Sequence, residues 1–127
     1  MKQFIFYFLI GCFFCFTSCK SQKTDTQLPA NLFQHWKHAH EEDTETYQVY
    51  RIASYNFSPA RARTGFEINK DGSFIHNTVA PNDAPETTSG KWKALSKKQL
   101  EVTLDNGKTM KILIQEVTSE VLKATIE

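Results

Sequence analysis

A short segment near residue 40 holds most of the side chains that could do chemistry. It runs from His35 to Asp43 and contains three histidines and three carboxylates in nine residues. If the segment is a strand, His38, His40 and Glu42 share one face at intervals of about 7 Å. Two imidazoles and a carboxylate spaced in this way can converge on a divalent cation.

A metal site at this segment would be incomplete. Structural zinc sites close with a fourth ligand, and none stands at a standard spacing; His76, the remaining histidine, would have to arrive from another strand. The alternative is that His38 and His40 are half-buried hydrogen-bonding residues and that Glu41 to Asp43 form a solvated turn. We favour this alternative and assign neither a metal nor a cofactor.

Two arginines, Arg61 and Arg63, follow the acidic residues Glu41 to Asp43, and their role can be interpreted in two ways. Arg61 and Arg63 could line the mouth of a cavity and grip an anionic headgroup, because guanidinium groups bind carboxylates and phosphates in bidentate fashion. They could instead pair with nearby carboxylates and hold strands in register, which the balanced charge favours. A few polar groups converging in an apolar cavity fix a ligand's orientation. The candidate ligand-binding residues are His38, His40, Glu42, Tyr50, Arg61 and Arg63.

The sequence offers little for catalysis or for nucleic-acid binding. It has no Gly-x-Ser-x-Gly elbow and no phosphate-cradling glycine loop, so we expect no enzymatic activity. Residues 1–18 contain one lysine and no acidic residue. Without them, the 15 basic and 14 acidic residues of the chain become 14 and 14. A neutral domain with mixed charges lacks the basic surface that nucleic acid requires.

The elements that would position these residues are strands. Leu100 to Leu104 and, apart from the extra apolar Leu113, Met110 to Ile114 alternate apolar and polar residues, and Asn106-Gly107 between them signals a tight hairpin. Asp71-Gly72 signals a second hairpin. The eight expected strands lie near 36–42, 47–53, 64–68, 73–79, 87–94, 100–104, 109–115 and 121–126, with one short helix or turn from Asn31. This pattern predicts an all-β fold, a small antiparallel up-and-down β-barrel.

Several of these residues carry a family resemblance. Trp36 in a first strand, Asp71-Gly72 in a hairpin and Gly90-Lys91-Trp92 opening the second half resemble the small bacterial lipocalin-like (calycin-type) domains. The first copy of the Gly-x-Trp motif, Gln34-His35-Trp36, lacks its glycine, so an open barrel or a two-sheet sandwich remains the alternative. The resemblance implies a binding module with a cup-shaped interior, and fold alone does not give the ligand.

The N-terminus predicts export. Lys2 precedes an apolar stretch from Phe4 to Phe16, too short to span a bilayer comfortably, and small residues stand before Cys19. This resembles the bacterial lipoprotein signal, which implies diacylation of Cys19 after cleavage. By the same resemblance, Lys20 rather than Asp after the cysteine implies the outer membrane. Ordinary secretion with cleavage elsewhere is the alternative. The expected divisions are signal peptide 1–18, flexible tether 19–30 and barrel domain 31–127.

Three functions remain open for a monomeric domain held at the cell envelope through lipidated Cys19. The first is a non-enzymatic binder of a small apolar or amphipathic ligand. The second is a filled barrel that acts as an interaction or envelope-maintenance lipoprotein, and the third is a histidine-based metal-handling protein. The side chains inside the barrel discriminate between the first two, because bulky inward residues leave no cavity.

Overall fold

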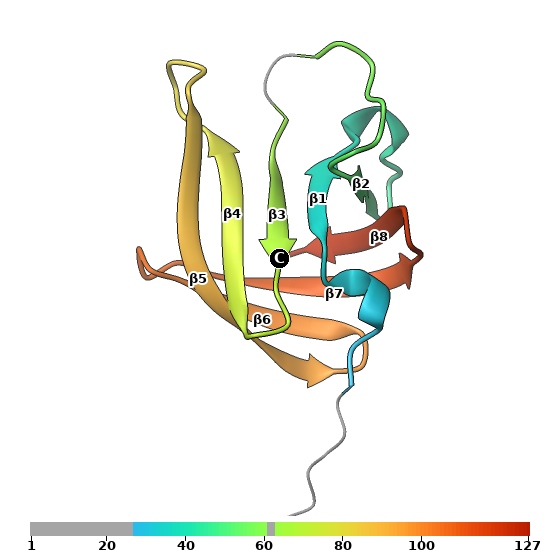
Figure 1. The fold of residues 1–127 in the computed structure, drawn as a ribbon, viewed down its shortest axis with the longest axis vertical. Coiled ribbons are helices and arrows are strands. Elements are labelled where there is room, and N and C mark those ends of the chain that lie inside the picture. The colour runs from blue at the N-terminus through green and yellow to red at the C-terminus, as the bar shows by residue number, and fades with distance from the viewer. Residues whose placement is uncertain (1–26, 61–62) are drawn as a thin grey trace, which may run out of the picture.

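The fold is a closed barrel of eight antiparallel strands, which confirms the predicted all-β class. The computed structural model describes residues 27–60 and 63–127. The strands are β1 (His35–His38), β2 (Gln48–Ile52), β3 (Gly65–Ile68), β4 (Ser73–Val79), β5 (Pro85–Ser96), β6 (Gln99–Leu104), β7 (Thr109–Val117) and β8 (Val121–Ile126), with the 3-10 turns η1 (Ala30–Leu32) and η2 (His40–Glu42). Figure 1 shows the hairpin between β4 and β5 at the end of the barrel opposite the N-terminal segment; we call this end the mouth and the opposite end the base.

Both predicted hairpins are present. Gly72 and Gly107 have φ angles of 92° and 85°, the left-handed region that a glycine reaches without strain. Gly72 lies in the turn between β3 and β4, and Gly107 in the turn between β6 and β7. These two turns fix the registers that place alternate residues of each strand inside the barrel.

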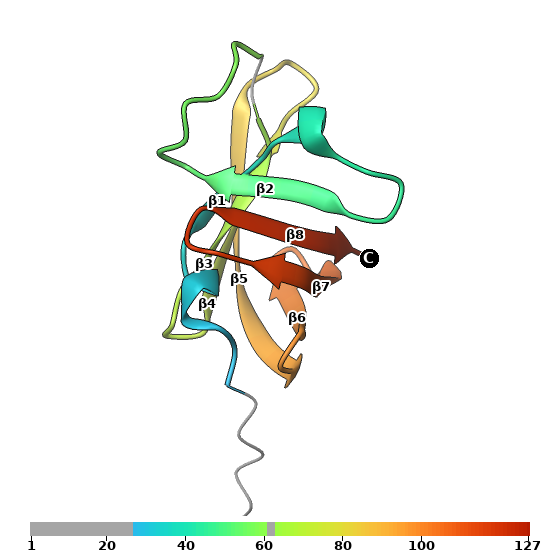
Figure 2. The same cartoon turned by 90° about the vertical axis from the view of Figure 1, so that its right-hand side faces the viewer.

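The strand order follows an up-and-down path for six of the eight strands. From β3 to β8 each strand pairs with the next one along the chain. The first two strands are interchanged relative to a simple ring, because β1 lies between β2 and β3 while β2 pairs with β8. Figure 2 shows β2 and β8 side by side. The barrel is therefore closed by contacts between the beginning and the end of the domain.

Large side chains fill the interior of the barrel. Trp36 in β1 is fully buried and donates a 2.9 Å hydrogen bond from Nε1 to the carbonyl oxygen of Leu32 in η1. The alternation of the sequence predicts a core of eight residues: Trp36, Phe66, Trp92, Leu100, Val102, Leu104, Ile112 and Ile114. All of them are buried except Trp92, which is half-buried. The core consists of Leu28, Leu32, Trp36, Tyr50, Phe66, Ile68, Phe74, Leu100, Val102, Leu104, Ile112, Ile114, Leu122 and Ala124.

Two expected boundaries differ in the structure. The first strand ends at His38 instead of continuing to Glu42, because the backbone turns at Ala39 into η2. The packed region begins before the expected domain start at Asn31, since Leu28 is buried against the core. The predicted signal and Cys19 lie outside the described residues. Within those residues, no helix has the length and apolar character needed to cross a membrane.

Candidate functional site

The histidine-rich segment does not form one face. His35 ends up beside Asn77, with 3.3 Å between His35 Nε2 and Asn77 Nδ2. His38 is half-buried at the last position of β1, whereas the His40 side chain is 58% exposed in η2. The prediction that His38 and His40 share one face of the first strand, toward the interior or the mouth of the barrel, is therefore wrong for His40. The two-residue alternation of a strand does not extend to His40, because the chain leaves the sheet after His38.

His38 belongs to a small polar network at the mouth of the barrel. Its Nε2 lies 2.8 Å from Oδ2 of Asp43, and its ring stacks on Tyr50 with centroids 5.0 Å apart. Asp43 also accepts a 2.9 Å hydrogen bond from the backbone N–H of Val49. Tyr50 donates a 2.8 Å hydrogen bond to Gln48, and burial raises the pKa of its hydroxyl above the usual value. Both His38 and Tyr50 thus have partners within the protein.

Aromatic rings continue from this network across the barrel. Tyr50 lies 4.9 Å from Phe66, Phe66 lies 5.6 Å from Phe74, and Phe74 lies 6.4 Å from His76, measured between ring centroids. We call this set, from His38 to His76, the aromatic row. Its central rings are buried, and it has a histidine at each end. The rings of Tyr50, Phe66 and Phe74 thus fill part of the barrel interior.

The arginines at this end are paired with carboxylates. Arg51 donates to both oxygens of Glu42, at 2.6 and 2.7 Å, and Arg63 donates to both oxygens of Glu41, one of them at 3.0 Å. Arg63 also bonds the carbonyl oxygens of His38 and Ser58. The structure therefore supports structural pairing for Arg63 and Glu42, against their predicted role as ligand contacts.

The electrostatics of η2 follow from these pairs. The hydrogen bond from Arg63 lowers the pKa of Glu41 to about 2, and the bond from Arg51 lowers the pKa of Glu42. Both carboxylates are thus ionised in the ordinary pH range. The two pairs fasten η2 to β2 and to the segment before β3. Arg61, the other predicted contact, lies outside the described residues.

The carboxylates and histidines do not gather into a metal site. Across residues 27–60 and 63–127, no three side chains of His, Cys, Asp or Glu are placed to hold a metal ion together. The His38 and His40 rings are 6.1 Å apart and meet edge to face. His76 lies at the other end of the aromatic row from His38. The three histidines of the metal hypothesis therefore do not converge.

A pocket of about 230 Å³ opens at the mouth, beside His76. The sequence suggests His76 only as a possible metal ligand, not as a ligand-binding residue. Its floor is apolar, from Leu104 and Met110, and its rim carries Thr78, Glu86, Thr88, Asn106, Lys108 and Thr109. His76 pairs with Thr88 across β4 and β5, on the same face as Phe74. Burial and the neighbouring charge of Lys108 lower the pKa of His76. The two-residue spacing of Phe74 and His76 was the sequence signal that could have predicted this inward-facing histidine.

Three charged or polar groups of this mouth pocket have no hydrogen-bond or ion-pair partner for their side chains among the described residues. Among the described residues, the imidazole of His76 has no hydrogen-bond partner, and neither Glu86 nor Lys108 has an ion-pair partner. Glu86 and Lys108 have opposite charges. The mouth pocket can therefore offer a cation, an anion and an imidazole to a small molecule resting on Leu104 and Met110.

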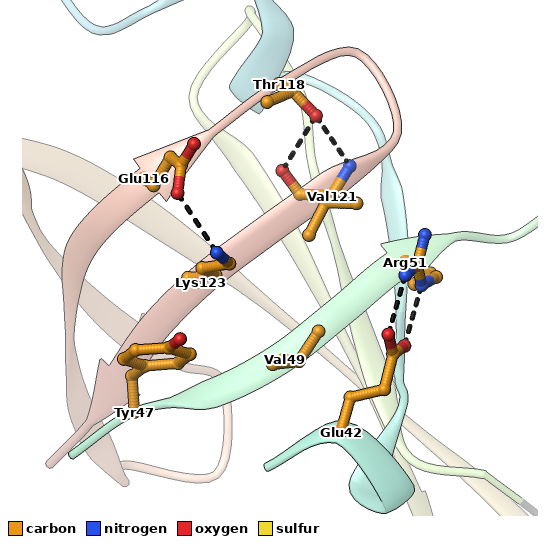
Figure 3. Close-up of a pocket in the computed structure, with 8 residues that line it drawn as sticks. All are labelled: Glu42, Tyr47, Val49, Arg51, Glu116, Thr118, Val121 and Lys123. Carbon is orange, nitrogen blue, oxygen red and sulfur yellow. Dashed lines mark hydrogen bonds and ion pairs between the residues drawn. The ribbon is translucent and has the colours of Figure 1, made fainter. Parts of the chain in front are cut away.

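A second pocket, of about 330 Å³, lies on the outside of β2 and β8 (Figure 3). Tyr47, Val49 and Val121 line it, and η2 stands at one side. Lys123 lies 3.2 Å from Glu116, which raises the pKa of the lysine. The Arg51–Glu42 pair stands on the side of η2, opposite the Lys123–Glu116 pair, as Figure 3 shows. The charges of this outer groove satisfy one another, so it offers an incoming group mainly apolar contact.

Comparison with known proteins leaves the geometry as the basis for function. No family model matches the chain, and no curated protein or solved structure is significantly similar to it.

Proposed function

We propose that this protein is a non-enzymatic envelope lipoprotein whose filled barrel binds its partner through the surface. The observation that supports the proposal is the packing of the interior. Phe66, Phe74 and Leu122 are at most 1% exposed, and the aromatic row places buried rings from β2, β3 and β4 inside the barrel. Eight strands enclose just enough space for side chains or for one small ligand, and here side chains occupy that space.

Anchoring through Cys19 is the part of the proposal that gives the domain its location. Two or three acyl chains on one cysteine anchor a protein stably, whereas one chain binds only marginally. We expect Cys19→Ala to move the protein from the detergent phase to the aqueous phase in a detergent partition. Cys15→Ala, a change inside the predicted signal, is the matched control and should leave the partition unchanged. A Cys19→Ala variant that stays in the detergent phase refutes lipid anchoring.

The filled interior makes the proposal distinct from a lipocalin-like carrier. An apolar fluorescent probe such as N-phenyl-1-naphthylamine should show no saturable binding to the domain, because the described core has no room for its rings. Saturable binding of one probe per chain, lost in a variant of Phe66 or Phe74 to Trp, would contradict the proposal. Such binding would instead favour the first function considered above, a binder of a small ligand inside the barrel.

The mouth pocket supports a second candidate, a small zwitterionic ligand. Lys108 would bind its carboxylate, Glu86 its ammonium group, and Leu104 and Met110 an apolar side chain, while His76 adds a hydrogen bond. Leucine is a suitable probe, and isocaproate, which lacks the ammonium group, is its control. We expect leucine to shift the ring proton resonances of His76 saturably and Lys108→Ala to abolish the shift. An unchanged His76 spectrum at millimolar leucine rejects this candidate.

A further inference from the structure

We propose that the base of the barrel is a membrane-docking surface that rests on an anionic lipid bilayer. The base is the end where the described chain begins, at Gln27, as Figure 1 shows. The proposal deepens the proposed function, since it rests on anchoring through Cys19. It assigns a task to side chains that neither the aromatic row nor the two pockets described above employ.

Two aromatic side chains meet at this surface without being fully buried. Phe33 follows η1 and Trp92 belongs to β5, and their ring centroids are 5.6 Å apart. Both are half-buried. They line a shallow groove of about 360 Å³ together with Gln27, Leu28, Ala30 and Lys70. Farther along β5, Leu95 is 39% exposed, which is unusual for a large apolar side chain in this structure.

The chemistry of Trp92 suits an interface between water and lipid. Its indole Nε1 already donates a 2.7 Å hydrogen bond to the carbonyl oxygen of Asn69, so the exposed part of the ring is apolar. Trp side chains concentrate at the headgroup level of bilayers, where one end is apolar and the other polar. Lys70 extends its Nζ over the Phe33 ring, 6.0 Å from the centroid. A lysine with an apolar stem can lie along lipid while its ammonium group reaches the headgroups.

Charge at the base favours anionic headgroups. The turn between β3 and β4 carries Lys70 and Asp71, and the turn between β5 and β6 carries Lys97 and Lys98. Both turns lie at the end of the barrel where the N-terminal segment leaves (Figure 1). These two turns together carry a net charge of +2. Lysines near a bilayer surface are attracted to anionic lipids.

The tether length keeps the base near the membrane. Seven residues lie between Cys19 and Gln27, so eight steps of at most about 3.5 Å in an extended chain give a reach of at most about 28 Å. The tether joins the domain at its base, so a lipid on Cys19 keeps the base within this reach of the bilayer.

The two tryptophans of the chain make a direct test possible. The full-length lipidated protein is placed in vesicles of phosphatidylcholine and phosphatidylglycerol whose acyl chains carry bromine, a quencher of Trp fluorescence. Trp36→Phe leaves only Trp92 at the base, and Trp92→Phe leaves only Trp36 inside the barrel. Because interfacial Trp lies at the headgroup level, we expect about twofold lower emission from Trp92, and no change in Trp36.

Each outcome has a clear meaning. Flotation with the vesicles but no quenching of Trp92 overturns the docking surface and leaves lipid anchoring intact. Failure to float overturns both. Lys70→Glu should reduce the quenching of Trp92 without affecting flotation, and equal quenching in pure phosphatidylcholine would overturn the preference for anionic lipid. If Trp36→Phe does not fold, the difference in quenching between wild type and Trp92→Phe isolates Trp92.

Discussion

The replacement Phe74→Ala tests whether the barrel is a packed core or a container. Phe74 lies in β4, is fully buried, and contacts Phe66 and His76 in the aromatic row. Removing its ring opens a cavity in the middle of the row. The backbone of β4 is paired on both sides, with β3 and β5, so the cavity cannot easily collapse.

The expected loss follows from the contacts of the ring. Burial of a Phe side chain contributes about 1.5–3 kcal/mol, and a stacked aromatic pair adds about 0.5–1.5 kcal/mol. With the cost of the cavity, a Phe-to-Ala change in a core destabilises by about 3–5 kcal/mol. Domains of this size have unfolding free energies of about 5–15 kcal/mol. The variant should therefore remain folded at low temperature but lose about a third of its stability.

Chemical denaturation measures this loss directly. The midpoint should fall while the slope against denaturant stays constant, because the surface exposed on unfolding barely changes. Benzene at 100 times its dissociation constant should then restore about 2.7 kcal/mol, since a dry apolar cavity binds it. Tyr55→Ala is the control: that ring is 41% exposed and should cost under about 1 kcal/mol. A loss below 1 kcal/mol for Phe74→Ala, or equal benzene stabilisation of the wild type, would show that the interior is not filled.

Two further predictions concern close approach and charge. Gly90→Ala should lower the melting temperature strongly, because a Cβ there would lie 2.6 Å from the carbonyl oxygen of Thr103; melting temperatures equal to wild type would refute the contact. The Arg63 pair lowers the pKa of Glu41 from 4.5 to about 2 in the folded protein, so the folded state binds this proton less readily. The stabilisation that the Arg63–Glu41 pair contributes is complete above pH 4.5 and is lost as the pH falls to 2. Glu41→Gln should remove this pH dependence from the unfolding free energy measured by denaturation at each pH.

The fold was largely predictable because period-two alternation and glycine turns are local signals. Leu100 to Leu104, Gly107 and Met110 to Ile114 needed no distant information to be read as a hairpin. The position of β1 between β2 and β3 was not predictable in this way, because pairing between distant strands leaves no local pattern. The same limit affected Trp92, whose half-exposure depends on where the barrel ends.

The site was harder to predict than the fold. Histidines and carboxylates near residue 40 pointed to a cluster, but the turn at Ala39 separates His38 from His40. Pairing of arginine with carboxylate was foreseen as the favoured interpretation, and the structure has it at Glu41 and Glu42. The mouth pocket depends on which way His76 faces, and alternation along Ser73–Val79 left that facing ambiguous.

The interchange of the first two strands makes the last strand decisive for folding. Without β8 (Val121–Ile126), the remaining strands could form an open sheet from β2 through β1 and β3 to β7, with unpaired edges at β2 and β7. Exposed edges of this kind pair with other chains and promote aggregation. Closure joins residues about 70 positions apart, which makes it a slow, late step. Loss of the last few residues, by proteolysis or a premature stop, would thus yield an aggregating chain instead of a slightly smaller barrel.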